Sequence, residues 1–109
     1  MTENPAARLK TRMRRDLAQA MKAKHTEDIA VLRSVLAAID NAEAPDPASL
    51  SGQTGEIERL ALTQADVQAV LGQAIRDCEQ AAAELAGLGQ GERAGALLRQ
   101  AVIARRYTG

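Results

Sequence analysis

Apolar residues recur along this chain at steps of three and four, the spacing that places side chains on one face of an α-helix. The first such set is Leu9, Met13, Leu17 and Met21, and the second is Ile29, Leu32, Leu36 and Ile39. A third set comprises Val67, Val70, Leu71, Ala74, Cys78, Ala81 and Leu85, and a fourth comprises Leu97, Leu98, Ala101, Val102 and Tyr107. The pattern predicts an all-α fold with helices over about 5–24, 27–43, 64–86 and 92–106.

The residues that flank these sets are typical of helix starts. Asn4 precedes Pro5, and a proline is tolerated at the first helical position. Thr26, followed by two acids, is expected to cap the second helix. Thr63 and Asp66 have the spacing of a capping box, and Leu62 and Val67 around them that of a hydrophobic staple.

The predicted connections indicate how the helices pair. Pro45 and Pro47 end the second helix, and the glycines of 87–91 end the third. Short turns on either side of a long connection favour a four-helix bundle made of two helical hairpins, within a single domain over 1–109. Residues 45–61 are predicted to form a loose loop, with partial anchors at Leu50, Ile57 and Leu60.

Composition restricts the core and the compartment. The chain has no Trp, no Phe and one Tyr, so its core must consist of aliphatic side chains, and we expect modest stability. No segment approaches the ~20 apolar residues of a membrane span. A single cysteine excludes an internal disulfide. We therefore expect a cytoplasmic protein without membrane contact.

Charge is balanced overall and unevenly distributed. Residues 8–33 contain eight Lys and Arg and three acids, a net charge of +5. Residues 40–92 contain ten acids and two arginines, a net charge of −8. Four more arginines follow, at Arg93, Arg99, Arg105 and Arg106. Such asymmetry is typical of a partner-binding surface, but also of oppositely charged helices that attract each other inside one domain.

No catalytic, metal or cofactor site emerges from the remaining candidates. Cys78 lies in the middle of a helix on the predicted inner face, where cysteine is usually an inert apolar residue. His25, in the first turn, is the only histidine, too few for a typical zinc site. The glycines of 87–91 lack the flanking strand and lysine of a phosphate loop.

Basic residues on the first helix are the remaining candidates for function. Arg8, Arg12, Arg15 and Lys22 share one helix face, and Lys24 and Arg33 follow closely. This face can contact phosphates, with the backbone dominating because no Phe or Trp is present to stack on bases. An ordinary solvated helix face is the alternative interpretation.

Two sequence stretches resemble the GatB/YqeY-like family. They are Leu17-Ala18-Gln19-Ala20-Met21-Lys22-Ala23-Lys24 and Leu32-Arg33-Ser34-Val35-Leu36-Ala37-Ala38-Ile39-Asp40-Asn41-Ala42-Glu43. The resemblance extends to the third helix start at Leu62-Thr63 and to Tyr107, where the family has Tyr-Leu-Pro. It implies a chain similar to the family's first, four-helical bundle. The family's second bundle, which is linked with tRNA binding, would follow Gly109.

The resemblance implies an accessory module related to glutamine-dependent tRNA amidotransferase subunits, which contacts tRNA or an amidotransferase-type complex. It also implies a general family-level assignment, carbon–nitrogen ligase activity with glutamine as amido-N-donor. The residues of this chain, however, show no recognisable active site. On the fourth helix, acids common in the family are replaced by Gly95, Leu97, Gln100, Val102 and Arg106. This apolar character favours a second hypothesis, a non-catalytic interaction module that self-assembles through the fourth helix.

Overall fold

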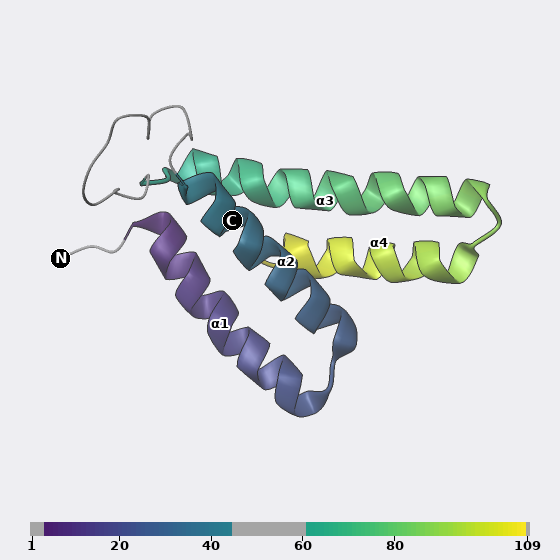
Figure 1. The fold of residues 1–109 in the computed structure, drawn as a ribbon, viewed down its shortest axis with the longest axis horizontal. Helices are drawn as coiled ribbons and strands as arrows, with labels where there is room; N and C mark the ends of the chain where they lie inside the picture. Colours follow the sequence, from purple (N-terminus) through teal and green to yellow (C-terminus); the bar gives the residue numbers. More distant parts are fainter. Residues whose placement is uncertain (1–3, 45–60, 109) are drawn as a thin grey trace, which may run out of the picture.

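A computed structural model describes residues 4–44 and 61–108, which form four α-helices without a strand in these ranges (Figure 1). Helix α1 spans Pro5–Ala23, α2 Thr26–Glu43, α3 Gln64–Gly87 and α4 Gly91–Arg105. The all-α prediction is confirmed, and each bound lies within one residue of the expected one. The predicted loop and its three anchors fall, except for Ala61, outside the described residues.

Two of the three predicted helix starts are confirmed. The Asn4 side chain accepts a hydrogen bond from the Ala7 amide at 2.7 Å. Thr63 accepts from the Asp66 amide at 3.1 Å, while the Asp66 carboxylate accepts from the Thr63 amide at 2.9 Å, which completes the capping box. The hydrogen bonds from Thr63 also lower the pKa of Asp66, because they stabilise the charged carboxylate.

The prediction that Thr26 caps α2 is wrong. Thr26 is the first helical residue, and the cap position is held by His25, whose side chain makes no capping hydrogen bond. The turn closes through the backbone instead. Lys24 takes a left-handed conformation with φ of 60°, and the His25 amide donates to the Ala20 carbonyl at 3.0 Å. The α1–α2 turn therefore uses its first residues to end α1 and leaves Thr26 inside the next helix.

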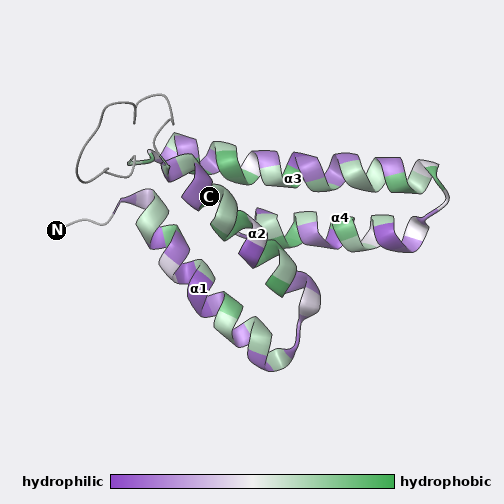
Figure 2. Ribbon diagram, viewed as in Figure 1, coloured by the Kyte–Doolittle hydropathy of each residue, from purple (hydrophilic) through white to green (hydrophobic). Residues whose placement is uncertain are grey.

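The core is aliphatic, as the composition requires. Its largest fully buried side chains are Met13, Leu32, Val35, Ile39 and Leu71, contributed by α1, α2 and α3. Each such side chain stabilises the fold by roughly 1.5–3 kcal/mol. In Figure 2 hydrophobic and hydrophilic positions alternate around each helix, as expected for amphipathic helices that share one core.

The predicted inner faces need two corrections. Leu98 and Val102 are 49% and 55% exposed, and α4 instead buries Ala94, Ala101, Ile103 and Ala104. The reason is that α4 packs against both α3 and α2, and small alanines allow this close approach better than leucine does. On α1, Met21 is 49% exposed because it lies in the last turn of the helix, beside the α1–α2 connection.

Helices α3 and α4 run side by side as one long antiparallel pair, and α1 and α2 lie next to each other across the base of that pair (Figure 1). The described chain measures 52 × 30 × 23 Å, since the far ends of α3 and α4 project beyond α2. None of the described helices combines the length and apolar character needed to cross a bilayer. This arrangement leaves one whole side of α1 facing solvent.

Candidate nucleic-acid interface

The outer side of α1 carries a straight row of basic residues. Arg8, Arg15 and Lys22 are exposed and follow one another at steps of seven residues, which places them on one line about 10.5 Å apart. They lie opposite the buried Ala6, Met13 and Ala20. We call Arg8, Arg15 and Lys22 the basic row. Its straightness follows from the helix, which fixes the spacing of the Cα atoms that carry these side chains before any ligand binds.

The other predicted contact residues surround the basic row rather than extend it. Arg12 lies at its inner edge, with its guanidinium 4.6 Å from the centre of the Tyr107 ring and a 3.4 Å hydrogen bond to the Arg106 carbonyl. Lys24 is exposed at the end of α1. Arg33 is exposed on α2, with Nη2 4.0 Å from the sulfur of Met21. The six predicted contact residues therefore lie on α1, at its C-terminal cap or, for Arg33, beside its last turn. Arg8, Arg15 and Lys22 form the basic row, and Arg12 also contacts Tyr107.

The inner side of α1 contains a basic residue with a structural role. Lys10 Nζ lies 2.5 Å from Glu43 Oε1 and 3.1 Å from Asp40 Oδ1, and it thereby joins α1 to the end of α2. Both Lys10 and Glu43 are largely buried, with side-chain exposures of 12% and 7%. Among the described residues, this is the one ion-pair cluster that links a basic residue of α1 to the acidic segment 40–92.

The remaining acids near α1 are engaged by the C-terminal part of the chain. Glu27 pairs with Arg99 at 2.8 Å, and Asp28 pairs with Arg106 at 3.4 Å. Arg105 pairs in the same way with Glu79 of α3 at 2.6 Å. Oppositely charged helices therefore do attract each other, but the cations that serve this purpose are Lys10 on the inner side of α1 and the arginines of α4 and its C-terminal end. The basic row has no ion-pair partner within residues 4–44 and 61–108.

These pairs also shift proton affinities. The hydrogen bond from Arg99 lowers the pKa of Glu27, and the same contact raises the pKa of Arg99. The contact stabilises the charged forms of both side chains, so both are charged at neutral pH and the pair persists. Glu27 is consequently not available to neutralise α1, although it is near in sequence.

Tyr107 joins the end of α4 to α1, a role that the sequence analysis did not identify. Its hydroxyl donates a hydrogen bond to Asp16 Oδ2 at 2.6 Å, and only 8% of the residue is exposed. Burial, followed by the bond to Asp16, raises the pKa of Tyr107 well above its usual value. Because Arg12 lies over its ring, the only aromatic side chain of the chain is not free to stack on a base.

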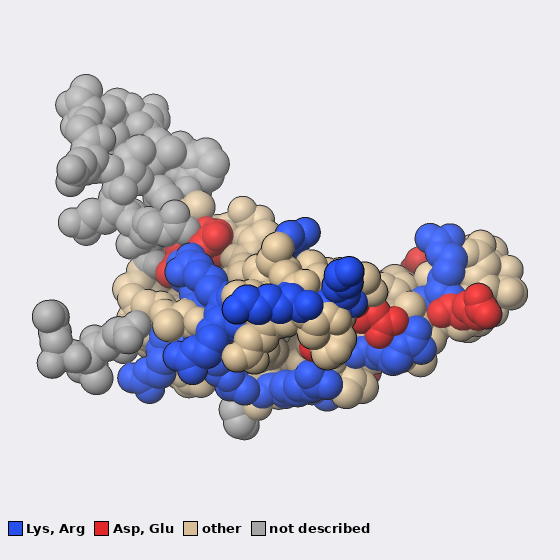
Figure 3. All heavy atoms as spheres, turned by 90° about the horizontal axis from the view of Figure 1, so that it is seen from below, with Lys and Arg blue, Asp and Glu red and all other residues tan. Residues whose placement is uncertain are grey.

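The surface around the basic row is strongly cationic and only shallowly hollowed. Figure 3 shows Lys and Arg side chains gathered over the half of the molecule that holds α1, with few acidic side chains among them. A hollow of about 260 Å³ lies beside Arg8 and Arg12, and another of about 340 Å³ lies between Arg12 and Arg106. Such a surface suits an extended polyanion better than a small enclosed ligand.

Cys78 does not have the surroundings of a nucleophile. It is partly exposed, and burial together with Asp77 and Glu79 raises the pKa of its thiol, whereas a reactive cysteine needs a lowered pKa. The described residues also contain no group of three His, Cys, Asp or Glu side chains arranged to hold a metal ion. The basic row is therefore the best-supported functional feature in the described ranges.

Comparisons with protein-family models, with curated proteins and with solved structures give no match to this chain.

Proposed function

We propose that this chain is an accessory module related to glutamine-dependent tRNA amidotransferase subunits, and that it contacts RNA, with tRNA as the first candidate, through the basic row; the alternative partner is an amidotransferase-type protein complex. The single observation that carries the proposal is that Arg8, Arg15 and Lys22 are exposed in one line without an ion-pair partner among the described residues. The choice of tRNA comes from the resemblance of residues 17–24 and 32–43 to the GatB/YqeY-like family, in which tRNA binding is linked with the second bundle and not with the bundle that these residues resemble.

The uncompensated charges make a polyanion a favourable partner. Opposite charges inside the protein would compete with phosphates for the same cations, and this competition is absent where no carboxylate is in contact. Each phosphate neutralised by a Lys or Arg releases condensed counterions, which supplies most of the binding free energy. Three cationic side chains whose Cα atoms are about 10.5 Å apart along a formed helix gain this free energy with little loss of backbone entropy.

Contacts to the RNA backbone should dominate over contacts to bases. Sequence-specific recognition of single-stranded RNA relies on aromatic rings that stack on bases. Tyr107, the only aromatic residue, is buried beneath Arg12 and bonded to Asp16. We therefore assign this chain a positioning role, in which sequence specificity comes from a partner or from RNA shape.

We assign the family-level label, carbon–nitrogen ligase with glutamine as amido-N-donor, to a partner subunit rather than to this chain. Glutamine-dependent amide transfer requires an activated nucleophile to release ammonia. Cys78 is the only cysteine, and the raised pKa of its thiol disfavours the thiolate. We expect no ammonia from glutamine with the purified chain, and its detection would contradict this assignment.

Fluorescence polarisation of a labelled tRNA transcript, titrated with the full chain at ~50 mM salt, tests the proposal directly. We expect saturable binding that a double variant, Arg8→Glu with Arg15→Glu, weakens at least ~10-fold. The matched control is Arg76→Glu with Arg93→Glu, which makes the same charge change at exposed sites on α3 and α4. Equal losses in the two double variants, or no binding by the unmodified chain, would reject the proposal.

A second candidate function rests on the exposed apolar residues of α4. Leu98 and Val102 are one helical turn apart and 49% and 55% exposed, so they form a small apolar patch. We propose as the alternative that this patch pairs two copies of the chain. Light scattering of the full chain and of a Leu98→Lys variant tests it. A monomer at every concentration would exclude self-association.

A further inference from the structure

A hollow lined by arginine and glutamine side chains lies between the N-terminal ends of α1 and α3, and its volume is about 260 Å³. Arg8 and Arg12 of α1 line one wall, and Gln64 and Gln68 of α3 line the other. The members of each pair are four residues apart, so they lie on the same face of their helix. We call this site the Arg8–Arg12 hollow. Its other lining residues are Pro5, Leu9, Val67 and Tyr107.

No carboxylate lines the Arg8–Arg12 hollow within the described part of the chain. Asp66, the acid of α3 that is nearest in sequence, is engaged in the capping box of that helix. The neighbouring hollow of about 340 Å³ also includes Arg12, but two carboxylates line it, from Asp16 and Asp28. Of the two hollows beside Arg12, only the Arg8–Arg12 hollow therefore has cations without anions, which favours an anionic ligand.

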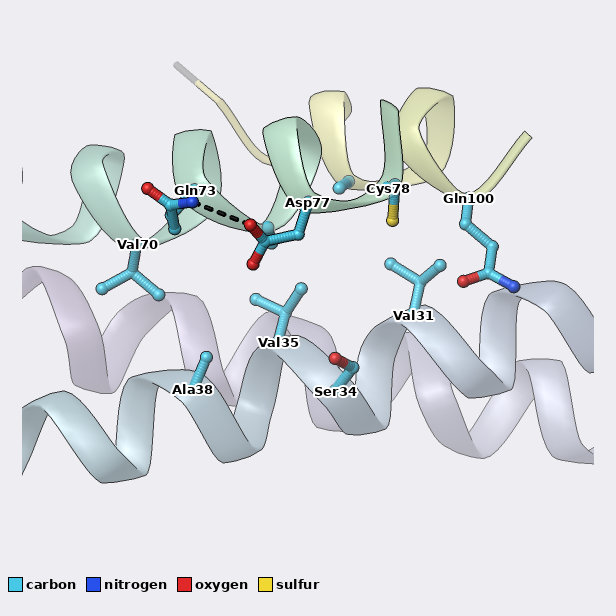
Figure 4. Close-up of a pocket in the computed structure, with 11 residues that line it drawn as sticks. Val31, Ser34, Val35, Ala38, Val70, Gln73, Asp77, Cys78 and Gln100 are labelled. Carbon is cyan, nitrogen blue, oxygen red and sulfur yellow. Dashed lines mark hydrogen bonds between the residues drawn. The ribbon is translucent and has the colours of Figure 1, made fainter. Parts of the chain in front are cut away.

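The groove of about 330 Å³ between α2, α3 and α4 does not provide a comparable surface (Figure 4). Val31 and Val35 of its α2 wall are 4% and 1% exposed, so little of that wall is accessible. None of the described residues that line it is a Lys or Arg, and Asp77 at its rim accepts a 2.8 Å hydrogen bond from Gln73. The groove therefore lacks the cations that a polyanion requires.

Arg12 presents a flat cationic group to the Arg8–Arg12 hollow. Its guanidinium carbon lies 4.6 Å from the centre of the Tyr107 ring, and its Nη2 donates a 3.4 Å hydrogen bond to the Arg106 carbonyl. Tyr107 is buried whereas Arg12 is exposed, so the side of the guanidinium away from the ring is open to solvent. A guanidinium is planar and weakly hydrated, and RNA-binding proteins stack unpaired bases on such planes.

Arg8 connects the hollow to the basic row, because it belongs to both. It is exposed and forms no ion pair among the described residues. A phosphate bound at Arg8 brings the nucleoside attached to it to the edge of the hollow. The base of a paired nucleotide stays stacked inside the duplex and does not enter. An unpaired nucleotide turns its base outward at a smaller cost in free energy.

We infer that the Arg8–Arg12 hollow binds one unpaired nucleotide of the RNA, with its phosphate at Arg8 and its base stacked on the outer side of the Arg12 guanidinium. Gln64 is exposed and supplies an amide donor and acceptor for the edge of the base. Stacking tolerates every base, so the hollow selects unpaired RNA over duplex rather than a sequence. The inference rests on the proposed RNA contact and narrows it to RNAs that have an unpaired nucleotide.

The test compares three labelled RNA duplexes as ligands of the full chain. The first has one unpaired adenosine in the middle of one strand, the second has an abasic ribose at that position, and the third is fully paired. The abasic RNA retains the extra phosphate and the flexibility of the bulge, so it isolates the contribution of the base. Fluorescence polarisation at ~50 mM salt measures the three affinities.

We expect the RNA with the unpaired adenosine to bind at least about fivefold more tightly than the other two, as stacking of one base typically provides. Arg12→Lys should remove this preference, because lysine keeps the charge and lacks the plane. Its affinity for the paired duplex should stay within about twofold. Arg15→Lys is the matched control, since it makes the same change in the basic row outside the hollow, and it should keep the preference.

Gln64→Glu provides an independent variant that leaves Arg12 in place. A glutamate at this position would pair with the arginines of the hollow and repel the phosphate of the nucleotide. An acid in the first turn of a helix is favourable, so the variant should fold, which circular dichroism verifies. We expect the preference for the unpaired adenosine to be lost. Gln80→Glu makes the same change at an exposed site elsewhere on α3 and should have no effect on it.

Equal binding of the adenosine and abasic RNAs by the unmodified chain would overturn the inference and leave the RNA contact standing, because the hollow would then recognise charge alone. A preference that survives Arg12→Lys or Gln64→Glu, or that Arg15→Lys also removes, would place the unpaired base elsewhere. Absence of binding to all three RNAs would reject the RNA contact and the inference together.

Discussion

The hydroxyl of Tyr107 donates a hydrogen bond to the carboxylate of Asp16 at 2.6 Å, which joins the last residues of the described chain to the middle of α1. This bond fixes α1 against the C-terminal end of α4, and it also engages the one acid within α1. Its consequence for function is indirect. Tyr107 engages the Asp16 carboxylate, which forms no ion pair with the basic row among the described residues.

The Tyr107–Asp16 bond should contribute measurably to stability. We expect Tyr107→Phe to lower the free energy of unfolding by about 1.5–3 kcal/mol, because a hydrogen bond to a charged group is lost from a partly buried site. Tyr107→Ala should cost more, about 3–5 kcal/mol, because the ring also leaves a cavity. Urea denaturation followed by circular dichroism provides both values. An unchanged free energy of unfolding in Tyr107→Phe would show that the hydroxyl is not important.

The same contact predicts a dependence on pH in the alkaline range. The pKa of Tyr107 is raised in the folded chain, so the folded state holds this proton more tightly than the unfolded state. The resulting stabilisation is complete below the ordinary tyrosine pKa of about 10 and is lost as the pH rises above it. The difference in unfolding free energy between the wild type and Tyr107→Phe should therefore shrink above about pH 10. A constant difference across that range would contradict the assignment.

The Lys10 cluster predicts a second stabilising contact. Lys10→Met removes the cation that lies 2.5 Å from the buried carboxylate of Glu43, and we expect a loss of about 1–3 kcal/mol in unfolding free energy. The added substitution Glu43→Gln should recover part of this loss, because the buried charge is removed as well. Lys22→Met is the control, and at this exposed site the change should stay within about 0.5 kcal/mol. Equal effects at the two lysines would mean that the buried pair contributes nothing.

Capping predicts contrasting effects at two threonines. Thr63→Ala should destabilise the chain by about 1 kcal/mol, because the α3 capping box is lost. Thr26→Ala should have little effect, because Thr26 lies within α2 and makes no capping hydrogen bond. Thermal unfolding of the two variants gives the comparison. If Thr26→Ala destabilised the chain more than Thr63→Ala does, Thr26 would act as the N-cap of α2, and the observed α1–α2 turn would be contradicted.

Much of the fold follows from short-range sequence patterns. The helix bounds could be predicted because Pro5, Thr63 and the glycines of 87–91 act on the backbone within a few residues. The orientation of α4 could not, because it depends on packing against two other helices, and Leu98 satisfies the same spacing rule as the buried Ala101.

The candidate site was predictable in part for the same reason. Helical spacing alone places Arg8, Arg15 and Lys22 in one row. Their lack of ion-pair partners in the described ranges was not predictable, because Arg99 and Arg106 engage Glu27 and Asp28 from far along the chain.

The salt dependence of tRNA binding tests the central claim most directly, because it counts phosphates contacted. If the basic row contacts three phosphates, the slope of log K against log salt should be about −2.1 to −2.7, a roughly 20- to 40-fold loss of affinity between ~50 and ~200 mM salt. The Arg8→Glu, Arg15→Glu variant should reduce the slope to about −1 or less, while the Arg76→Glu, Arg93→Glu control keeps it. A slope that is unchanged by the first pair, or reduced equally by both, would show that the basic row is not the RNA-binding surface.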